Sequence, residues 1–229
     1  MEQALVNNFP EPGHRFRNSN LAQAWLVLVL AILFGAALAA IQVGLSEIIL
    51  ENKQNETFER VPELVWGPGG AQKLAAQKLE VEIIPGTLQV TSGSKSETFS
   101  LFKVTRDKQL AGWVIKASGP GYADKIELLI GVDPEVQALT GLFVLEQKET
   151  PGLGNKITSP AWRRQFAGQF TARPLAVVKG TSGGAGQTID ALTGATISSR
   201  SVTRIVNRVM AAVQGKLTPD TVRLSERRK

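Results

Sequence analysis

Apolar side chains dominate the N-terminal part of the chain. Residues 21–46 contain no charged residue, and residues 24–41 are apolar or small throughout. A run of that length crosses the roughly 30 Å hydrocarbon core of a bilayer as an α-helix. The pattern predicts a transmembrane helix over residues 21–46 after a polar leader at residues 1–20. The alternative is a cleaved signal peptide, which the small residues at 35–40 favour, but the apolar run exceeds the about 7–15 residues of a signal core.

The charges on either side of this helix predict its orientation. Arg15 and Arg17 precede it, whereas Glu47 and Glu51 follow it. The positive-inside rule therefore puts the N-terminus in the cytoplasm. We expect a single-pass protein of the bacterial inner membrane, with everything after residue 46 on the outer, periplasmic face and the lipid bilayer as a partner.

A connecting segment is expected at residues 47–79. Its first part is charged and compatible with a helix, and residues 61–70 contain two prolines and three glycines. Proline and glycine are the strongest local breakers of regular structure. The pattern predicts a helix that stops at residue 61 and a second, short helix at residues 71–79.

From residue 80 the pattern changes to short strands separated by turn residues. Strands are predicted at residues 81–84, 88–90, 99–104, 111–116, 126–132, 139–145 and 175–179. Asp107 and Lys108 mark a hairpin tip. Short gaps favour antiparallel neighbours, because a parallel crossover needs a dozen or more residues. A short helix is expected at residues 160–166, where the spacing of Trp162 and Phe166 favours a place in the core.

A second helical pattern follows residue 199. Its apolar positions have the spacing of one helix face, and they are Val202, Ile205, Val206, Val209, Met210 and Val213. Small and hydroxyl residues precede it, which is typical of a helix N-terminus with outward-pointing backbone N–H groups. Such an end favours an anion by roughly 0.3–1 kcal/mol. The same residues are also compatible with a plain helix cap after a glycine turn. Together these elements predict an α+β protein, with one membrane helix and a single domain of mainly antiparallel sheet and packed helices at residues 80–215.

Composition excludes several kinds of chemistry. The chain has no cysteine, and His14 is its single histidine. Thiol nucleophiles, cysteine-held metals and multi-histidine metal sites are therefore excluded, and any redox chemistry needs an organic cofactor. The net charge is +6, but no zinc-finger, RNP or KH signature accompanies it, so nucleic acid is not an expected partner. Part of the excess lies in a basic tail at residues 216–229, for which we expect a solvated, frayed end.

Two stretches resemble a known family. Residues 190–199 read Asp-Ala-Leu-Thr-Gly-Ala-Thr-Ile-Ser-Ser, and residues 149–154 read Glu-Thr-Pro-Gly-Leu-Gly. Taken alone, the second stretch is a proline-glycine loop. In this order and about forty residues apart, the two resemble the FMN-binding domain shared by RnfG of the Rnf electron-transport complex and its counterpart NqrC of the sodium-translocating NADH:quinone reductase. A Gly-Tyr loop at residues 121–122 also matches, although Ala123 and Asp124 replace a more glycine-rich continuation and leave a flavin contact there open.

The resemblance implies a role for each motif residue. It implies covalent FMN, held by a phosphoester on Thr196, with small side chains and backbone N–H groups around the phosphate at Thr193, Gly194, Ala195, Ser198 and Ser199. Asp190 is either presented to the flavin transferase that attaches FMN or caps the turn. The border of the flavin ring would be Glu149, Thr150, Pro151, Gly152, Leu153 and Gly154.

The form of both motifs resembles RnfG more than NqrC. The implied function is electron relay through FMN in a membrane complex that couples ferredoxin and NAD redox chemistry to ion translocation, with the other Rnf subunits as partners. No acid–base pair suggests a stand-alone enzyme, and no catalytic residue is assigned. The NqrC role in the quinone reductase and a membrane-tethered, non-redox scaffold module remain the alternatives.

Overall fold

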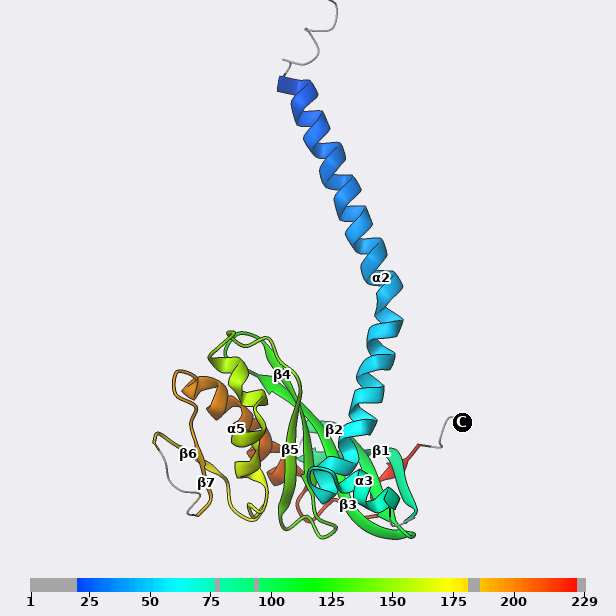
Figure 1. The fold of residues 1–229 in the computed structure, drawn as a ribbon, viewed down its shortest axis with the longest axis vertical. Helices are drawn as coiled ribbons and strands as arrows, with labels where there is room; N and C mark the ends of the chain where they lie inside the picture. The colour runs from blue at the N-terminus through cyan, green and yellow to red at the C-terminus, as the bar shows by residue number, and fades with distance from the viewer. Residues whose placement is uncertain (1–19, 77–78, 93–94, 181–185, 226–229) are drawn as a thin grey trace, which may run out of the picture. The chain divides into compact units, whose positions relative to one another are not determined.

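A computed structural model describes residues 20–76, 79–92, 95–180 and 186–225 of the chain (Figure 1). The chain forms two compact units, Met1–Lys53 and Gln54–Lys229. Helix α2 (Asn20–Trp66) supplies the described part of the first unit and the start of the second.

The first unit contains a helix that is long and apolar enough to cross a membrane, and none of its apolar window is buried against protein. The second unit begins inside the same helix. The predicted stop at residue 61 is wrong, because α2 continues through Pro62 to Trp66. An internal proline costs about 3 kcal/mol. Val61 and Leu64 beside it are 0% and 5% exposed, and burying two such side chains contributes about 3–6 kcal/mol, which offsets that cost. A short helix, α3 (Gly70–Ala76), follows as predicted.

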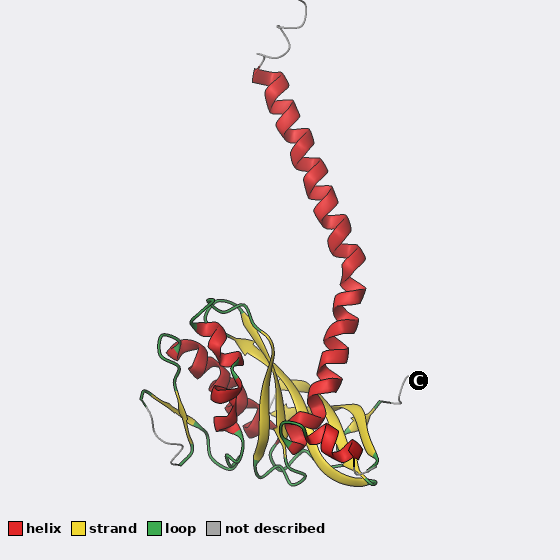
Figure 2. Ribbon diagram, in the orientation of Figure 1, coloured by secondary structure: helices red, strands yellow, loops and turns green. Residues whose placement is uncertain are grey.

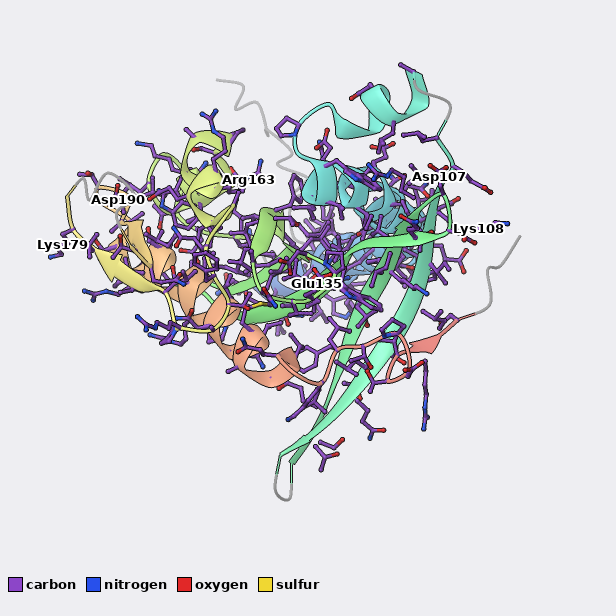
Figure 3. All side chains as sticks on the ribbon, turned by 90° about the horizontal axis from the view of Figure 1, so that it is seen from below. Asp107, Lys108, Glu135, Arg163, Lys179 and Asp190 are labelled. Atoms are coloured by element: carbon purple, nitrogen blue, oxygen red, sulfur yellow. The ribbon has the colours of Figure 1, made fainter. Side chains whose placement is uncertain are left out.

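The centre of the second unit is a six-stranded sheet in the order β5-β4-β3-β2-β1-β8. Its strands are β1 (Val81–Ser92), β2 (Lys95–Arg106), β3 (Gln109–Pro120), β4 (Lys125–Val132), β5 (Leu139–Glu146) and β8 (Arg223–Leu224). All neighbouring pairs are antiparallel, which confirms the prediction. The two strands expected at residues 81–84 and 88–90 are one continuous strand. Asp107 and Lys108, labelled in Figure 3, form the predicted hairpin tip with φ of 49° and 66°.

Both faces of this sheet are covered by helices (Figure 2). On one face, Ile126, Leu128 and Ile130 of β4 join the main core with helix α5 (Thr196–Val213). On the other face, Leu129 packs with Val61 of α2 in a second, smaller core. Because β4 is buried on both sides, its sequence is a nearly continuous apolar run instead of an alternating one.

The elements between β5 and α5 lie over the main core. They are η1 (Gly154–Thr158), α4 (Pro160–Arg163), η2 (Arg164–Phe166), β6 (Ala176–Val178) and β7 (Thr188–Asp190), and β6 and β7 pair in parallel. Trp162 and Phe166 are both buried and meet edge to face with ring centroids 5.3 Å apart, so their predicted place in the core is confirmed. Residues 181–185, between β6 and β7, lie outside the described residues.

The basic tail departs from expectation. Leu217 and Val222 are buried, and Arg223 and Leu224 form β8, which pairs with Gly86 and Thr87 of β1. Most of residues 216–225 are exposed, as predicted, but the prediction of a frayed end is wrong for them, because two apolar side chains hold this segment at the edge of the sheet. Residues 226–229 lie outside the described part of the chain.

Candidate functional site

The candidate site is built on the first turn of α5. The helix begins at Thr196, and all six apolar residues of the predicted face are buried, which confirms that prediction. The N-cap residue is Ala195, which has no side chain able to accept a hydrogen bond from the first turn. The backbone N–H groups of that turn are therefore left for another acceptor, and the positive end of the helix dipole favours an anionic one.

The turn that leads into this helix is fixed by backbone geometry. Gly194 has φ of +79°, a conformation that side-chain-bearing residues rarely adopt. Ser199, fully buried, accepts a hydrogen bond from the N–H of Leu192 at 3.1 Å and donates one to the carbonyl of Ala195 at 3.0 Å. Its hydroxyl thus bridges the two sides of the turn, and the turn presents Thr196 at the surface, half-buried.

The two motifs meet in space. A Cβ added at Gly194 would lie 2.9 Å from the side chain of Leu153, so the 149–154 loop rests directly on the turn. Ser198 donates a hydrogen bond of 2.5 Å to Glu149 Oε2. Gly154 lies at the same point, where a Cβ would be 2.9 Å from atoms of both residues. Stretches about forty residues apart in sequence therefore form one surface.

Glu149 connects this surface to a third segment. Its side chain is 4% exposed. While Oε2 accepts from Ser198, Oε1 accepts from the backbone N–H groups of Tyr122 at 2.8 Å and Ala123 at 3.2 Å. A buried carboxylate is stable only when hydrogen bonds replace its hydration. Here these bonds come from the β3–β4 turn and from α5, so Glu149 holds three segments of the chain together.

The β3–β4 turn is the part of the site that sequence reasoning left open. Gly121 donates to the carbonyl of Asp124 at 2.8 Å, which closes the turn. The backbone N–H of Lys125, and then the ammonium of Lys148 at 3.2 Å, lower the pKa of the Asp124 carboxyl. The Tyr122 ring is 64% exposed while its backbone is held by Glu149. The sequence left open whether this loop belongs to the site, and the bond from Tyr122 to Glu149 joins it to the two motifs.

Asp190 lies at the end of β7, opposite Val178 of β6 (Figure 3). Its N–H donates to Gln165 Oε1 at 2.8 Å, and its carbonyl accepts from the Trp162 indole, also at 2.8 Å. The main chain of the motif's first residue is therefore tied to the core helices. The N-cap position of α5 belongs to Ala195, five residues further on.

The remaining predicted residues surround the turn at the surface. The exposed ones are Thr193, Gly194, Thr150, Pro151 and Gly152. Leu153 and Ile197 are exposed apolar side chains, at 44% and 54%. With the exposed Tyr122 they provide apolar surface on the three segments that Glu149 joins. An uncapped helix end beside apolar side chains fits a ligand that combines a phosphate with a flat, apolar ring system, as FMN does.

Comparison with known proteins agrees with this geometry. The FMN-binding domain family matches residues 121–211, a range that includes the β3–β4 turn and both motifs. The RnfG protein of Acetobacterium woodii, part of a Na⁺-translocating ferredoxin:NAD⁺ oxidoreductase complex, is 31% identical over 192 residues, which cover 82% of this chain and 89% of the relative. The chain belongs to the RnfG family.

Other relatives support this membership. The RnfG protein of an ion-translocating oxidoreductase complex from Pseudoalteromonas atlantica is 32% identical, over 81% of this chain and 85% of the relative. The crystal structure of NqrC from Shewanella oneidensis has a TM-score of 0.56 at 21% identity and covers 70% of this chain and 93% of that one, which shows the shared fold. Membership of the RnfG family, together with the apolar helix in α2, makes this a membrane-anchored protein whose cofactor is FMN.

Proposed function

We propose that this chain carries FMN as a phosphoester on the Thr196 hydroxyl and relays electrons in an Rnf-type, ion-translocating ferredoxin:NAD⁺ oxidoreductase complex. Its relatives are subunits of such complexes. The observation that supports the site best is the meeting of the two motifs and the Gly-Tyr turn at the uncapped start of α5.

The choice of Thr196 follows from what the other hydroxyls do. Ser198 is 3% exposed and donates to Glu149, and Ser199 is fully buried and donates to the Ala195 carbonyl. Thr193 is exposed but lies in the turn, before the helix begins. Thr196 is the first residue of the helix and is half-buried, and no hydrogen bond of its hydroxyl is found within the described part of the chain. Of the motif's hydroxyls, it alone combines access with the field of the helix N-terminus.

Attachment of FMN needs a second enzyme. The ester forms when the Thr196 oxygen displaces the leaving group of a flavin phosphoanhydride. The threonine O–H bond and the anhydride P–O bond break, one O–P bond forms, and the proton passes to a base of the flavin transferase. No oxidation state changes. We propose that Asp190, near the surface at the end of β7, belongs to the segment that this transferase recognises.

Once attached, FMN supplies one-electron transfer between the partner subunits. The chain's own residues hold it in place. The unpaired N–H groups of the first turn of α5 would bind the phosphate, and the exposed side chains of Leu153, Ile197 and Tyr122 would offer apolar contacts to the flavin ring. Glu149 fixes the relative positions of the segments that carry them.

We infer further that the chain is a single-pass protein of the bacterial inner membrane with the flavin domain on the periplasmic face. The support is the flanking charge, with arginines before the apolar run and glutamates after it. A reporter enzyme that is active only in the periplasm, fused to the C-terminus, should be active. Activity of the matching cytoplasmic reporter instead would reverse the orientation.

The covalent bond is tested by in-gel flavin fluorescence of denatured protein from a host that has the transferase. Wild type and Thr196→Ser should give a fluorescent band, because both keep a hydroxyl, whereas Thr196→Ala should be dark with an unchanged thermal unfolding midpoint. Fluorescence in Thr196→Ala and its loss in Thr193→Ala would assign the ester to the other threonine. A dark wild-type band would reject the covalent carrier and favour a non-redox scaffold.

A second candidate function is that of NqrC in a sodium-translocating NADH:quinone reductase. A relative of that type from Vibrio anguillarum is 27% identical over 59% of this chain and 52% of its own length. Purification of the tagged chain from host membranes separates the two. Ferredoxin-dependent NAD⁺ reduction by the purified complex supports the Rnf assignment, and NADH-dependent quinone reduction supports the alternative.

A further inference from the structure

A hollow of about 400 Å³ lies in the second compact unit, on the face of the sheet that the end of α2 covers. Its lining includes Arg60 and Glu63 of α2, Phe143 of β5, and Arg163 and Arg164 of the short helices after β5. None of these residues belongs to either flavin motif. Figure 3 labels Arg163, the last residue of α4.

Positive charge in the hollow is only partly compensated. Arg60 pairs with Glu63 at 3.1 Å, and no second acidic side chain is among the described residues that line the hollow. Arg60 and Arg163 both lie over the Phe143 ring, 4.9 and 4.8 Å from its centroid. Burial, and then the nearby Arg60 charge, lower the pKa of Arg163. The hollow is therefore lined by three arginines and one glutamate, with Arg60 and Arg163 partly buried and Arg164 exposed.

Two buried donors here are unsatisfied within the described part of the chain. Arg60 Nε and Thr140 Oγ1 are shielded from solvent and have no hydrogen-bond partner, and both residues line the hollow. Arg163, by contrast, is fixed, because its Nε donates to the Thr158 carbonyl and another guanidinium nitrogen to the Leu142 carbonyl, both at 2.9 Å. Because Arg60 Nε and Thr140 Oγ1 are shielded, an incoming acceptor would meet the rest of the Arg60 guanidinium, whose side chain is 38% exposed, and the exposed Arg164. Carboxylates match the fork of such guanidinium groups.

The rest of the lining is apolar. Leu64 and Leu142 form its buried floor, and the apolar surface that solvent reaches comes from Pro160, Ala167 and the half-buried Phe143. A free inorganic anion would use the donors but leave this apolar surface open to water. An acidic side chain with an apolar neighbour on the same protein segment would satisfy the donors and cover the apolar walls together, as anchor residues at interfaces do.

We propose that the hollow is a docking socket for an acidic, apolar-flanked segment of another subunit of the same membrane complex. The inference rests on the proposed function, which makes the chain one subunit of such a complex. It adds a contact surface that is separate from the flavin motifs. Arg163 follows Trp162, whose indole holds the main chain of Asp190, so the socket and the flavin site share helix α4.

Charge reversal tests the socket in the full-length, tagged chain expressed in its host. Arg60→Glu and Arg164→Glu leave the backbone bonds of Arg163 intact. Each should lower the yield of co-purifying subunits about tenfold or more, since like charges would then meet at the contact. Arg204→Glu, at an exposed position on α5 outside the socket, is the matched control and should keep the full complement.

The readouts distinguish the possible failures. In-gel flavin fluorescence of both socket variants, and the thermal unfolding midpoint of Arg164→Glu, should equal those of wild type. Arg60→Glu loses its ion pair with Glu63 and its contact with the Phe143 ring, so it should unfold at a lower temperature while keeping the flavin. If both variants co-purify with the other subunits at the wild-type yield, the docking proposal is overturned while the flavin function stands. If no Rnf subunit co-purifies with the tagged wild-type chain, the proposed function would be overturned instead.

The absence of cysteine in the chain permits a direct identification of the occupant. Arg164→Cys, labelled with a thiol-reactive photocrosslinker, should crosslink to a peptide of an Rnf subunit that contains Asp or Glu, identified by mass spectrometry. Arg204→Cys, with the same label, should not give that peptide. Crosslinks only to phospholipid would make the hollow a lipid headgroup site and overturn the proposal.

Discussion

The hydrogen bond between Glu149 and Ser198 is the contact that joins the two motifs, and a double-mutant cycle measures it. The variants are Glu149→Ala, Ser198→Ala and the double substitution. If the bond forms as the structure has it, each single variant destabilises the second compact unit, and the double variant costs less than the sum of the two.

The expected magnitudes follow from burial. Ser198→Ala removes one donor to a carboxylate that is 4% exposed, and a hydrogen bond to a charged group contributes about 1.5–3 kcal/mol. Glu149→Ala frees three donors, but Tyr122 is 64% exposed and water can replace the carboxylate at the backbone N–H groups of its turn. We therefore expect about 2–4 kcal/mol for Glu149→Ala and a coupling of about 1.5–3 kcal/mol for the pair.

The assay is urea unfolding of the full-length chain in non-ionic detergent. The fluorescence of Trp113 and Trp162, both buried in the domain, reports the transition. Arg204→Gln, on the exposed face of α5, is the control and should change the free energy of unfolding by no more than about 0.5 kcal/mol. A coupling below about 0.5 kcal/mol between Glu149 and Ser198 would show that the motifs are not joined by this bond.

Three further predictions concern residues around the same site. Gly154→Ala should lower the flavin fluorescence per protein in gels, because its Cβ would lie 2.9 Å from atoms of Glu149 and Ser198. Gly152→Ala is the control: its Cβ would meet no atom within 4 Å, so the fluorescence should be kept despite a φ of +75°. Equal fluorescence in the two variants would contradict the steric conflict at Gly154. Trp162→Phe should cost about 1–2 kcal/mol in urea unfolding, since its indole N–H donates at 2.8 Å to a backbone carbonyl of the motif, and an unchanged stability would show that this bond contributes nothing. The pKa of Asp124 is lowered in the folded protein, so its contribution to stability is present above the ordinary carboxyl pKa and is lost as pH falls through the lowered one. The Tm of wild type should therefore exceed that of Asp124→Asn at pH 7, and the difference should vanish by about pH 2. A difference that grows on acidification would contradict the shift.

Local patterns in the sequence predict the elements of this protein well. An uncharged apolar run, a helical spacing of buried residues in α5 and short gaps between strands each depend on neighbours along the chain, and the structure has the apolar helix, the amphipathic helix and the antiparallel sheet. Asp107 and Lys108 form the hairpin tip for the same reason, because a two-residue turn is specified by its own residues.

Packing between distant segments decided what the local patterns could not. Pro62 predicts a helix end, but burial of Val61 and Leu64 against the sheet keeps the helix going to Trp66. Basic residues predict a frayed tail, but two apolar side chains bring residues 223–224 to the sheet edge. In both cases tertiary burial supplies more free energy than the local preference opposes.

The candidate site also combines features that local sequence predicts with contacts that only the fold creates. From the sequence alone, Thr196 is expected at a helix start among small residues, with a glycine-rich loop about forty residues earlier. The folded chain adds three contacts: Glu149 binds Ser198, Tyr122 binds the same carboxylate, and Ser199 bonds within the turn. A buried carboxylate selects its donors by proximity in space, and no spacing along the chain encodes that choice.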